Sequence, residues 1–143
     1  MYLLDTNVVS ELRKVRSAKA DPNVAAWSDQ VDAAELHISV VTLHELEVGL
    51  LLVQRRDAAQ GRVLRAWFDE HVLPAFAGRI LPVSEPVVRR SAPLHVPDPR
   101  PLADAMIAAT GLVHRLTVVT RNVSDFTTTG VQVHNPWDAS PAR

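Results

Sequence analysis

Short apolar runs rich in β-branched residues alternate with longer helical stretches, and this alternation constrains the fold more than any other feature of the chain. The runs with a strand-like period span residues 2–4, 36–39, 80–83, 116–120 and 131–134. The stretches with a helix-like period span residues 8–13, 24–30, 42–56, 58–72, 85–91 and 102–114. Strands separated by helices need crossover connections. The pattern therefore predicts an α/β fold with three layers, in which helices cover both faces of a mostly parallel sheet of about five strands.

The chain shows no sign of a second folding unit. Its 143 residues suit one domain, and no repeat or linker divides them, so we expect a single domain over residues 1–143. Residues 91–101 are rich in proline and cannot form a regular helix. We interpret this segment as a stiff loop that leads into the helix at residues 102–114, because Pro101 stands where the start of a helix tolerates proline.

Polar residues stand where such a sheet collects its functional groups. Asp5 follows the first predicted strand, and Asn122 and Asp125 follow the fourth. Glu45 and Asp104 lie near the starts of helices that should begin at the same edge. Right-handed crossovers bring the carboxyl ends of parallel strands together at one edge of the sheet. We therefore expect these five side chains to converge on one pocket.

Each of these residues also has a purely structural explanation. Asp5 suits the cap of a turn or helix. The pattern Thr42-x-x-Glu45 matches a capping box, in which two side chains bond free amides at a helix start. Asp104 in a first helical turn is favoured by the helix dipole, and residues 122–125 resemble a turn. It is the convergence of the whole set that favours a functional site.

The expected chemistry of that pocket is metal binding. Several carboxylates in one place repel each other unless a cation neutralises them. The chain has no cysteine, and its six histidines are scattered along the sequence. Oxygen ligands without thiolate or imidazole favour a hard divalent cation, so we expect Mg²⁺ or Mn²⁺.

Four stretches of the chain, in register, resemble the PIN domains, in particular the VapC and FitB toxins of bacterial type II toxin–antitoxin pairs. They are Leu4-Asp5-Thr6-Asn7, residues 39–45 with the trailing Gly49, residues 102–110 around Asp104, and Thr120-Arg121-Asn122. Residues 76–82 and the closing Asn135-Pro136-Trp137 are similar to the FitB-like branch. The resemblance implies a metal-dependent endoribonuclease that cleaves RNA and inhibits translation until an antitoxin neutralises it.

The resemblance also implies roles for single residues. Asp5, Glu45 and Asp104 would be the acidic residues of the site, and Asp5 and Asp104 would hold the metal ion. Thr6 and Asn7 would anchor the metal-bound carboxylates by hydrogen bonds, as outer groups do in metal sites.

The fourth position of the site stays open. Some PIN domains carry Asp where this chain has Asn122, and others carry the Asn-x-x-Asp pattern that Asn122 forms with Asp125. Asn122 supplies no charge, so either Asp125 takes the fourth acidic role or three carboxylates suffice. With Glu45, Asp125 would orient the attacking water or hold a second metal ion.

The partners implied by the resemblance are an RNA substrate, a VapB-like antitoxin and a second copy of the chain, in a homodimer and in toxin–antitoxin hetero-oligomers. An antitoxin would inhibit by placing an Arg side chain in the acidic pocket, where it would replace the cation. Apolar stripes at residues 43–56 and 63–76 are candidates for the dimer contact. Basic groups at residues 13–19, 55–65 and 89–90 would contact RNA phosphates, although the formal net charge is −1.

The composition argues against a membrane protein. No apolar run approaches the roughly 20 residues that span a bilayer. The chain opens on a predicted core strand instead of a signal peptide. We expect a cytoplasmic protein that contacts no membrane.

Two other functions fit part of the pattern. A non-catalytic RNA- or protein-binding module of the same fold is favoured by the uncharged Asn122. An Asp-based phosphotransfer protein would use Asp5 as its phosphorylated nucleophile. However, Asn7 stands where a phosphatase would carry a second Asp, and the only lysines are Lys14 and Lys19.

Overall fold

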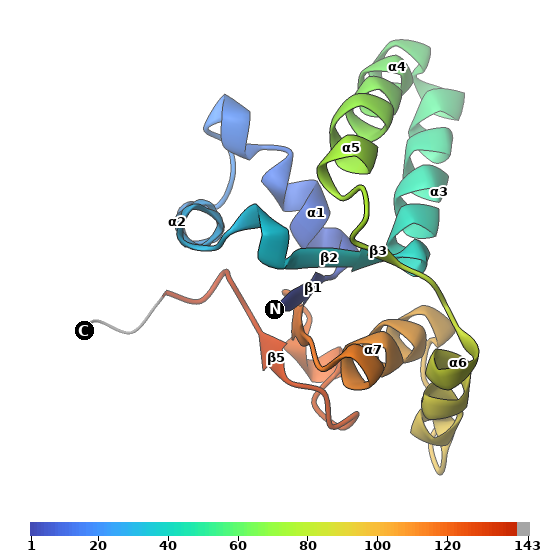
Figure 1. Cartoon of the computed structure of the whole chain (residues 1–143). Helices are drawn as coiled ribbons and strands as arrows, with labels where there is room; N and C mark the ends of the chain where they lie inside the picture. The colour runs from blue at the N-terminus through green and yellow to red at the C-terminus, as the bar shows by residue number, and fades with distance from the viewer. Residues whose placement is uncertain (140–143) are drawn as a thin grey trace.

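Five strands form one parallel sheet, in which strands distant in sequence are neighbours (Figure 1). The computed structural model describes residues 1–139, so the last residues of the predicted domain, 140–143, lie outside the described part. The strands are β1 (Tyr2–Leu4), β2 (Leu36–Ser39), β3 (Ile80–Leu81), β4 (Thr117–Val119) and β5 (Val133–His134). Their order is β3-β2-β1-β4-β5, and the strand pairings are parallel. The predicted parallel sheet is confirmed, although β3, β4 and β5 are shorter than predicted.

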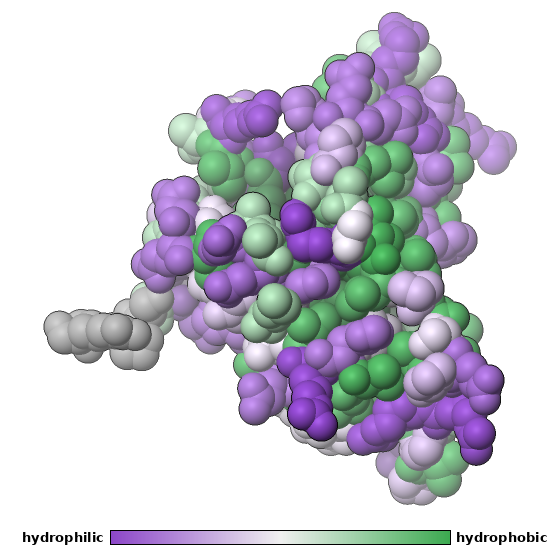
Figure 2. Space-filling view, viewed as in Figure 1, coloured by the Kyte–Doolittle hydropathy of each residue, from purple (hydrophilic) through white to green (hydrophobic). Residues whose placement is uncertain are grey.

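Helices connect the strands and cover both faces of the sheet (Figure 1). The α-helices are α1 (Thr6–Leu12), α2 (Pro22–Gln30), α3 (Val40–Arg56), α4 (Ala58–Trp67), α5 (Leu73–Ala75), α6 (Glu85–Ser91) and α7 (Leu102–His114). Short 3₁₀ turns lie at Val15–Ser17, Ala33–Glu35, Ala92–His95 and Val123–Asp125. Apolar side chains gather on the surface between the lower end of α3 and α7 (Figure 2). Within residues 1–139, no helix has the length and apolar character needed to cross a membrane.

The helix predicted at residues 58–72 is not continuous. After α4 the chain forms a π-helical segment, Phe68–Val72, and then the short α5. Pro74 explains the break, since in a regular α-helix its ring would clash with the carbonyl group four residues earlier. A wider π turn before the proline avoids that clash.

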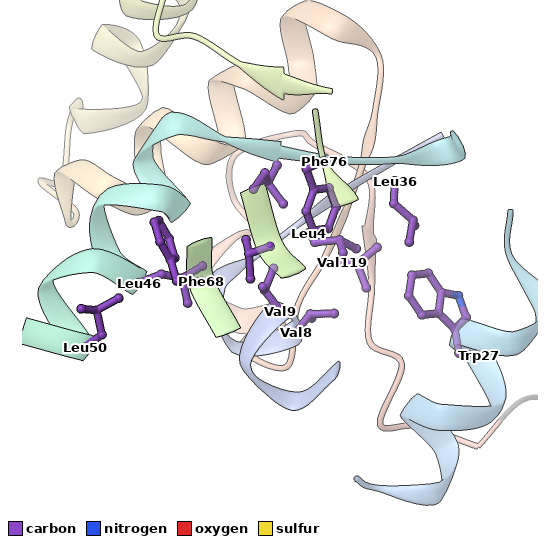
Figure 3. Packing of buried hydrophobic residues seen from close by; sticks show 12 residues of the cluster. Leu4, Val8, Val9, Trp27, Leu36, Leu46, Leu50, Phe68, Phe76 and Val119 are labelled. Carbon is purple, nitrogen blue, oxygen red and sulfur yellow. The ribbon is translucent and has the colours of Figure 1, made fainter. Parts of the chain in front are cut away.

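Two apolar cores form because neighbouring residues of a strand point to opposite faces of the sheet. Leu4 and Val119 lie in the core beneath α1, α2, α3 and the π-helical segment, which Figure 3 shows at close range. Leu3 and Val118 lie in the second core, against Ile107 and Ala108 of α7. The predicted three-layer α/β fold is therefore confirmed.

Helix α7 packs closely on the sheet because its inner face carries small residues. Ala105, Ala108 and Ala109 are fully buried. At Gly111 an added Cβ atom would lie only 2.8 Å from a methyl group of Val131. This close approach sets the position of Asp104, which lies in the first turn of α7.

Helix α3 begins earlier than predicted, directly after the last residue of β2. Its cap is Ser39, whose Oγ accepts a 3.0 Å hydrogen bond from the amide of Val41. Thr42 therefore lies inside the first turn, where it is fully buried, and Glu45 lies in the second turn. The predicted Thr42–Glu45 capping box is wrong, because Ser39 already caps the helix. Glu45 is thus free to serve another role.

Candidate active site

Asp5 is both a helix cap and a buried charge at the end of β1. Its amide continues the strand ladder, donating to the carbonyl of Val119 at 2.9 Å. Its Oδ1 accepts a 2.8 Å hydrogen bond from the amide of Thr6 and so caps α1. The side chain is only 6% exposed. The structural role expected of Asp5 is therefore real, and it uses only Oδ1 of the carboxylate.

Two polar side chains hold the second oxygen of Asp5. Thr120 Oγ1 donates to Asp5 Oδ2 at 2.8 Å, and Asn7 Nδ2 donates to the same oxygen at 3.3 Å. The register explains the first bond, because Leu4 pairs with Val119 and the next residues are therefore neighbours. This network keeps the Asp5 carboxylate in one orientation.

Glu45 reaches the same edge from α3 and is bonded to the residue that follows Asp5. Thr6 Oγ1 donates to Glu45 Oε1 at 2.6 Å. The Thr42 hydroxyl, buried below, lies 3.4 Å from that of Thr6. One residue of α1 therefore links Glu45 to the backbone at Asp5.

Four carboxylates act on each other electrostatically. Burial, followed by the charges of Asp125, Asp5 and Glu45, raises the pKa of Asp104 to about 6, and Arg100 opposes this rise. Burial likewise raises the pKa of Asp5, against the hydrogen bonds from Thr120 and Thr6, and Glu45 and Asp125 raise it further. The charges of Glu45 and Asp125 therefore reach both Asp5 and Asp104.

The fourth charge near Asp5 and Asp104 comes from Asp125. It is exposed and lies in the 3₁₀ turn Val123–Asp125. Asn122 is also exposed and precedes this turn, where its amide donates to Thr120 Oγ1 at 3.0 Å. Asn122 therefore contributes a backbone contact, whereas Asp125 contributes charge.

The structure adds residues that sequence reasoning did not single out for the site. Thr120 contacts Asp5 directly, and Thr42 supports Thr6. Arg100 arrives from the proline-rich segment and is held by Leu94 O at 2.7 Å and Thr128 Oγ1 at 3.0 Å. The sequence signal for Thr120 is a polar residue directly after the fourth strand. Its contact with Asp5 can be predicted only once the register between β1 and β4 is known.

The donor set fits a hard divalent cation with an open coordination shell. In the described chain no three acidic or His side chains are grouped closely enough to enclose a metal ion by themselves. Mg²⁺ does not require such a cage, since it keeps several waters and binds through one or two carboxylates plus substrate oxygens. The mutual repulsion seen at Asp104 is what a cation would relieve.

Comparison with known proteins shows the same fold in relatives that cover nearly the whole chain. The family model of the PIN domain matches residues 2–129. The toxin FitB of Neisseria gonorrhoeae is 39% identical over 145 residues, which cover 96% of this chain and 99% of FitB. VapC ribonuclease Y4jK of Sinorhizobium fredii is 38% identical over 146 residues, which cover 96% of this chain and 99% of the relative.

Solved structures agree with these relatives. The crystal structure of FitAcB from Neisseria gonorrhoeae contains a chain with a TM-score of 0.84 at 37% identity, and the match covers 96% of this chain and 99% of that one. A structure of FitAB bound to an IR36 DNA fragment matches with a TM-score of 0.88 at 34% identity, over 100% of both chains.

Proposed function

The chain belongs to the PIN-domain family, and we propose that it is a metal-dependent endoribonuclease that acts as the toxin of a type II toxin–antitoxin pair. In this proposal residues 1–143 form one PIN domain. The protein hydrolyses RNA phosphodiester bonds in the cytoplasm and inhibits translation until an antitoxin neutralises it. Relatives named as a toxin and as a VapC ribonuclease support both halves of the proposal.

The main observation behind the proposal is that the charges of neighbouring carboxylates raise the pKa values of Asp5 and Asp104. Asp125, Asp5 and Glu45 together help to raise the pKa of Asp104 to about 6. A protein that used these residues only as helix caps would gain nothing from placing them together, because each one destabilises the others when charged. The phosphotransfer alternative finds no support in the family matched.

We assign metal binding to Asp5 and Asp104. Asp5 is held by Thr120 and Asn7, and Asp104 lies in the first turn of α7, where the charge of Asp5 raises its pKa. Mg²⁺ is the expected ion and Mn²⁺ a plausible substitute, because both prefer oxygen ligands. When bound, the ion would lower the pKa of a coordinated water and neutralise charge on the scissile phosphate.

The other residues of the site orient the reactants. Glu45, which is bonded to Thr6, would accept a proton from the attacking water. Asp125 takes the fourth acidic position and would help to hold a second ion when RNA adds oxygen ligands. Thr6 and Asn7 are positioning residues, and Asn122 supports Thr120 through its amide.

RNA cleavage tests the proposal directly. Wild-type protein expressed from an inducible promoter should arrest growth and produce new RNA ends, and purified protein should cleave RNA with Mg²⁺ but not with EDTA. Asp104→Asn and Asp5→Ala should abolish cleavage while RNA binding persists. Wild-type expression without growth arrest or new RNA ends would contradict the toxin proposal and favour the non-catalytic binding module.

The proposed protein partner is a VapB-like antitoxin, and a groove beside α1 suits a segment of it. The groove has a volume of about 690 Å³ and an apolar floor that includes Val9, Val72 and Phe76. Arg13 and Arg16 stand on its rim, and none of the described residues that line it is acidic. An amphipathic segment with acidic flanks would complement this surface.

Charge reversal separates antitoxin binding from cleavage. The double change Arg13→Glu and Arg16→Glu should weaken binding of the antitoxin and leave the kcat of RNA cleavage near the wild-type value, because both residues lie outside the acidic site. Any loss of their contacts with RNA phosphates should raise KM alone. An Arg side chain of the antitoxin would also enter the acidic pocket in place of the cation. A toxin–antitoxin complex with no guanidinium near Asp5 would contradict that second contact.

We propose homodimerisation through the exposed side of α3. Val48, Leu51 and Leu52 are 40%, 48% and 60% exposed, although α3 already buries Leu46 and Leu50 in the core. Exposed apolar residues grouped on one helix often mark a protein interface. Light scattering should give a dimer for the wild type and a monomer for Leu52→Glu.

A further inference from the structure

A cation–π pair stands beside the acidic site. The guanidinium carbon of Arg121 lies 5.4 Å from the ring centroid of Trp137. Arg121 is exposed and follows Thr120, the residue bonded to Asp5. Trp137 is half-buried and packs against the core beneath α1 and α2.

Both partners of the pair are fixed through their backbones. The amide of Arg121 donates to Asn7 Oδ1 at 3.2 Å, and Asn7 in turn donates to Asp5 at 3.3 Å. Trp137 lies in the segment after β5, which runs beside α2 (Figure 1), and its carbonyl accepts a 2.7 Å hydrogen bond from Asn23. The position of the pair is therefore set relative to the metal-binding carboxylate.

The charge of Arg121 is not neutralised by an ion pair. In residues 1–139, no carboxylate lies within salt-bridge distance of its guanidinium. Glu11, the acid that Arg121 influences, is already bonded to Lys14 at 3.2 Å and to the amide of Asp21 at 2.8 Å. A guanidinium in cation–π contact with Trp137 and without an ion pair thus lies next to Thr120, which bonds Asp5.

We propose that Arg121 and Trp137 form a platform on which an unpaired RNA base stacks next to the scissile phosphate. The inference rests on the proposed ribonuclease function. A guanidinium that lies over an aromatic ring can present a planar face to a base, and its N–H groups can still reach a phosphate. Single-stranded RNA is the ligand class, because bases inside a duplex have no free face to stack.

Cleavage kinetics test the platform. The substrate is a single-stranded RNA oligonucleotide of randomised sequence, with a duplex of the same composition as the second arm. For Arg121→Ala the KM for single-stranded RNA should rise roughly tenfold or more, as expected for the loss of a base stack, while kcat stays near the wild-type value. Arg121→Lys should recover only part of the loss, since it restores the charge but not the plane. Trp137→Leu should raise KM more than Trp137→Phe.

Arg115→Ala is the matched control, because it removes the same charge from an exposed residue at the C-terminal end of α7, outside the basic groups expected to contact RNA. Equal KM values for Arg121→Ala and Arg115→Ala, with active wild-type protein, would overturn the platform alone. A full rescue by Arg121→Lys would do the same, since charge without stacking would then suffice. Wild-type protein that cleaves no RNA would overturn the proposed function and this inference together.

Discussion

The hydroxyl of Thr120 donates a 2.8 Å hydrogen bond to Asp5 Oδ2 and so joins the ends of two neighbouring strands within the site. The Thr120 hydroxyl oxygen also accepts hydrogen bonds from the amide of Asn122 at 3.0 Å and from Asn7 Nδ2 at 3.3 Å. A hydroxyl has one donor and two acceptor sites, so Thr120 is fully used. Because its donated bond lowers the pKa of Asp5 against the effect of burial, Thr120 favours the charged form that binds a cation.

Replacing Thr120 by Val should weaken metal binding. The change removes the bond that lowers the pKa of Asp5 and leaves the amide of Asn122 without its acceptor. Loss of an outer hydrogen bond of this kind typically weakens a metal site by roughly 10- to 100-fold. Mg²⁺ titration of the cleavage rate should show this shift, and saturating Mg²⁺ should restore much of the rate.

Thr120→Ser is the control for that change, since it keeps the hydroxyl at the same backbone position. We expect its Mg²⁺ dependence to stay close to that of the wild type. An unchanged Mg²⁺ dependence in Thr120→Val would show that the hydroxyl does not tune the site.

The pH dependence of cleavage should report the titration of Asp104. Burial and the neighbouring carboxylates raise its pKa to about 6, so the metal-free protein holds a proton there in mildly acidic solution. Mg²⁺ must displace this proton, so its affinity should fall by roughly tenfold for each pH unit below that pKa. Cleavage at low Mg²⁺ should drop accordingly. A rate that stays constant between about pH 8 and about pH 5 would contradict the assignment.

The same titration should lower the folding stability as pH rises, whereas it raises the cleavage rate. The pKa of Asp104 is about 6 in the folded protein, above the 3.8 that is usual for an aspartate in water, so the folded state binds the proton more tightly between these values. Stability therefore falls as pH rises through this window and is lower at neutral pH. Thermal unfolding without metal should show this fall, and Mg²⁺ should reverse it.

Asp104→Asn should stabilise the metal-free protein at neutral pH. The change removes one of the mutually repelling charges, and a gain on the order of 1 kcal/mol would raise Tm by a few degrees. Mg²⁺ should no longer raise Tm, because a ligand is lost. Asp98→Asn, an exposed change in the proline-rich segment, should leave both the metal-free Tm and the Mg²⁺ effect unchanged. A lower Tm for Asp104→Asn would contradict the repulsion.

The parallel sheet was predictable because it follows from patterns along the chain, and the same patterns lead us to expect the carboxylates at one edge of it. Val118 and Val119 are typical of a strand that is buried on both faces, and Asp5 directly follows the first strand. The role of Thr120 was not predictable in this way. That role depends on the pairing of Leu4 with Val119. The register between two strands far apart in the chain cannot be predicted from the sequence of either strand.

Local rules failed where tertiary structure decides between two candidates. Ser39 and Thr42 both suit a helix cap, and the choice falls to Ser39 because β2 ends there and α3 starts at once. The family resemblance likewise does not decide whether Asn122 or Asp125 takes the fourth position of the site. Electrostatic coupling across the folded pocket, which no sequence pattern encodes, favours Asp125.

Gly61 should resist substitution because α3 and α4 touch at this residue. A Cβ atom added there would lie 2.5 Å from Cα of Gln54, which belongs to the backbone of α3. The two helices would have to separate, and overpacking of this kind costs roughly 1–3 kcal/mol. Gly61→Ala should therefore lower Tm, even though alanine is favoured over glycine by about 1 kcal/mol inside a helix.

Gly49→Ala isolates the helix propensity from the packing, and the two changes together test the contact between α3 and α4. Gly49 lies in the middle of α3, and a Cβ atom there would meet nothing within 4 Å. Alanine should stabilise the protein by roughly 0.5–1 kcal/mol, because it restricts the unfolded chain and favours the helix. Chemical denaturation of both variants should give shifts of opposite sign. Equal stabilisation by the two changes would mean that α3 and α4 lie further apart in solution than in this structure.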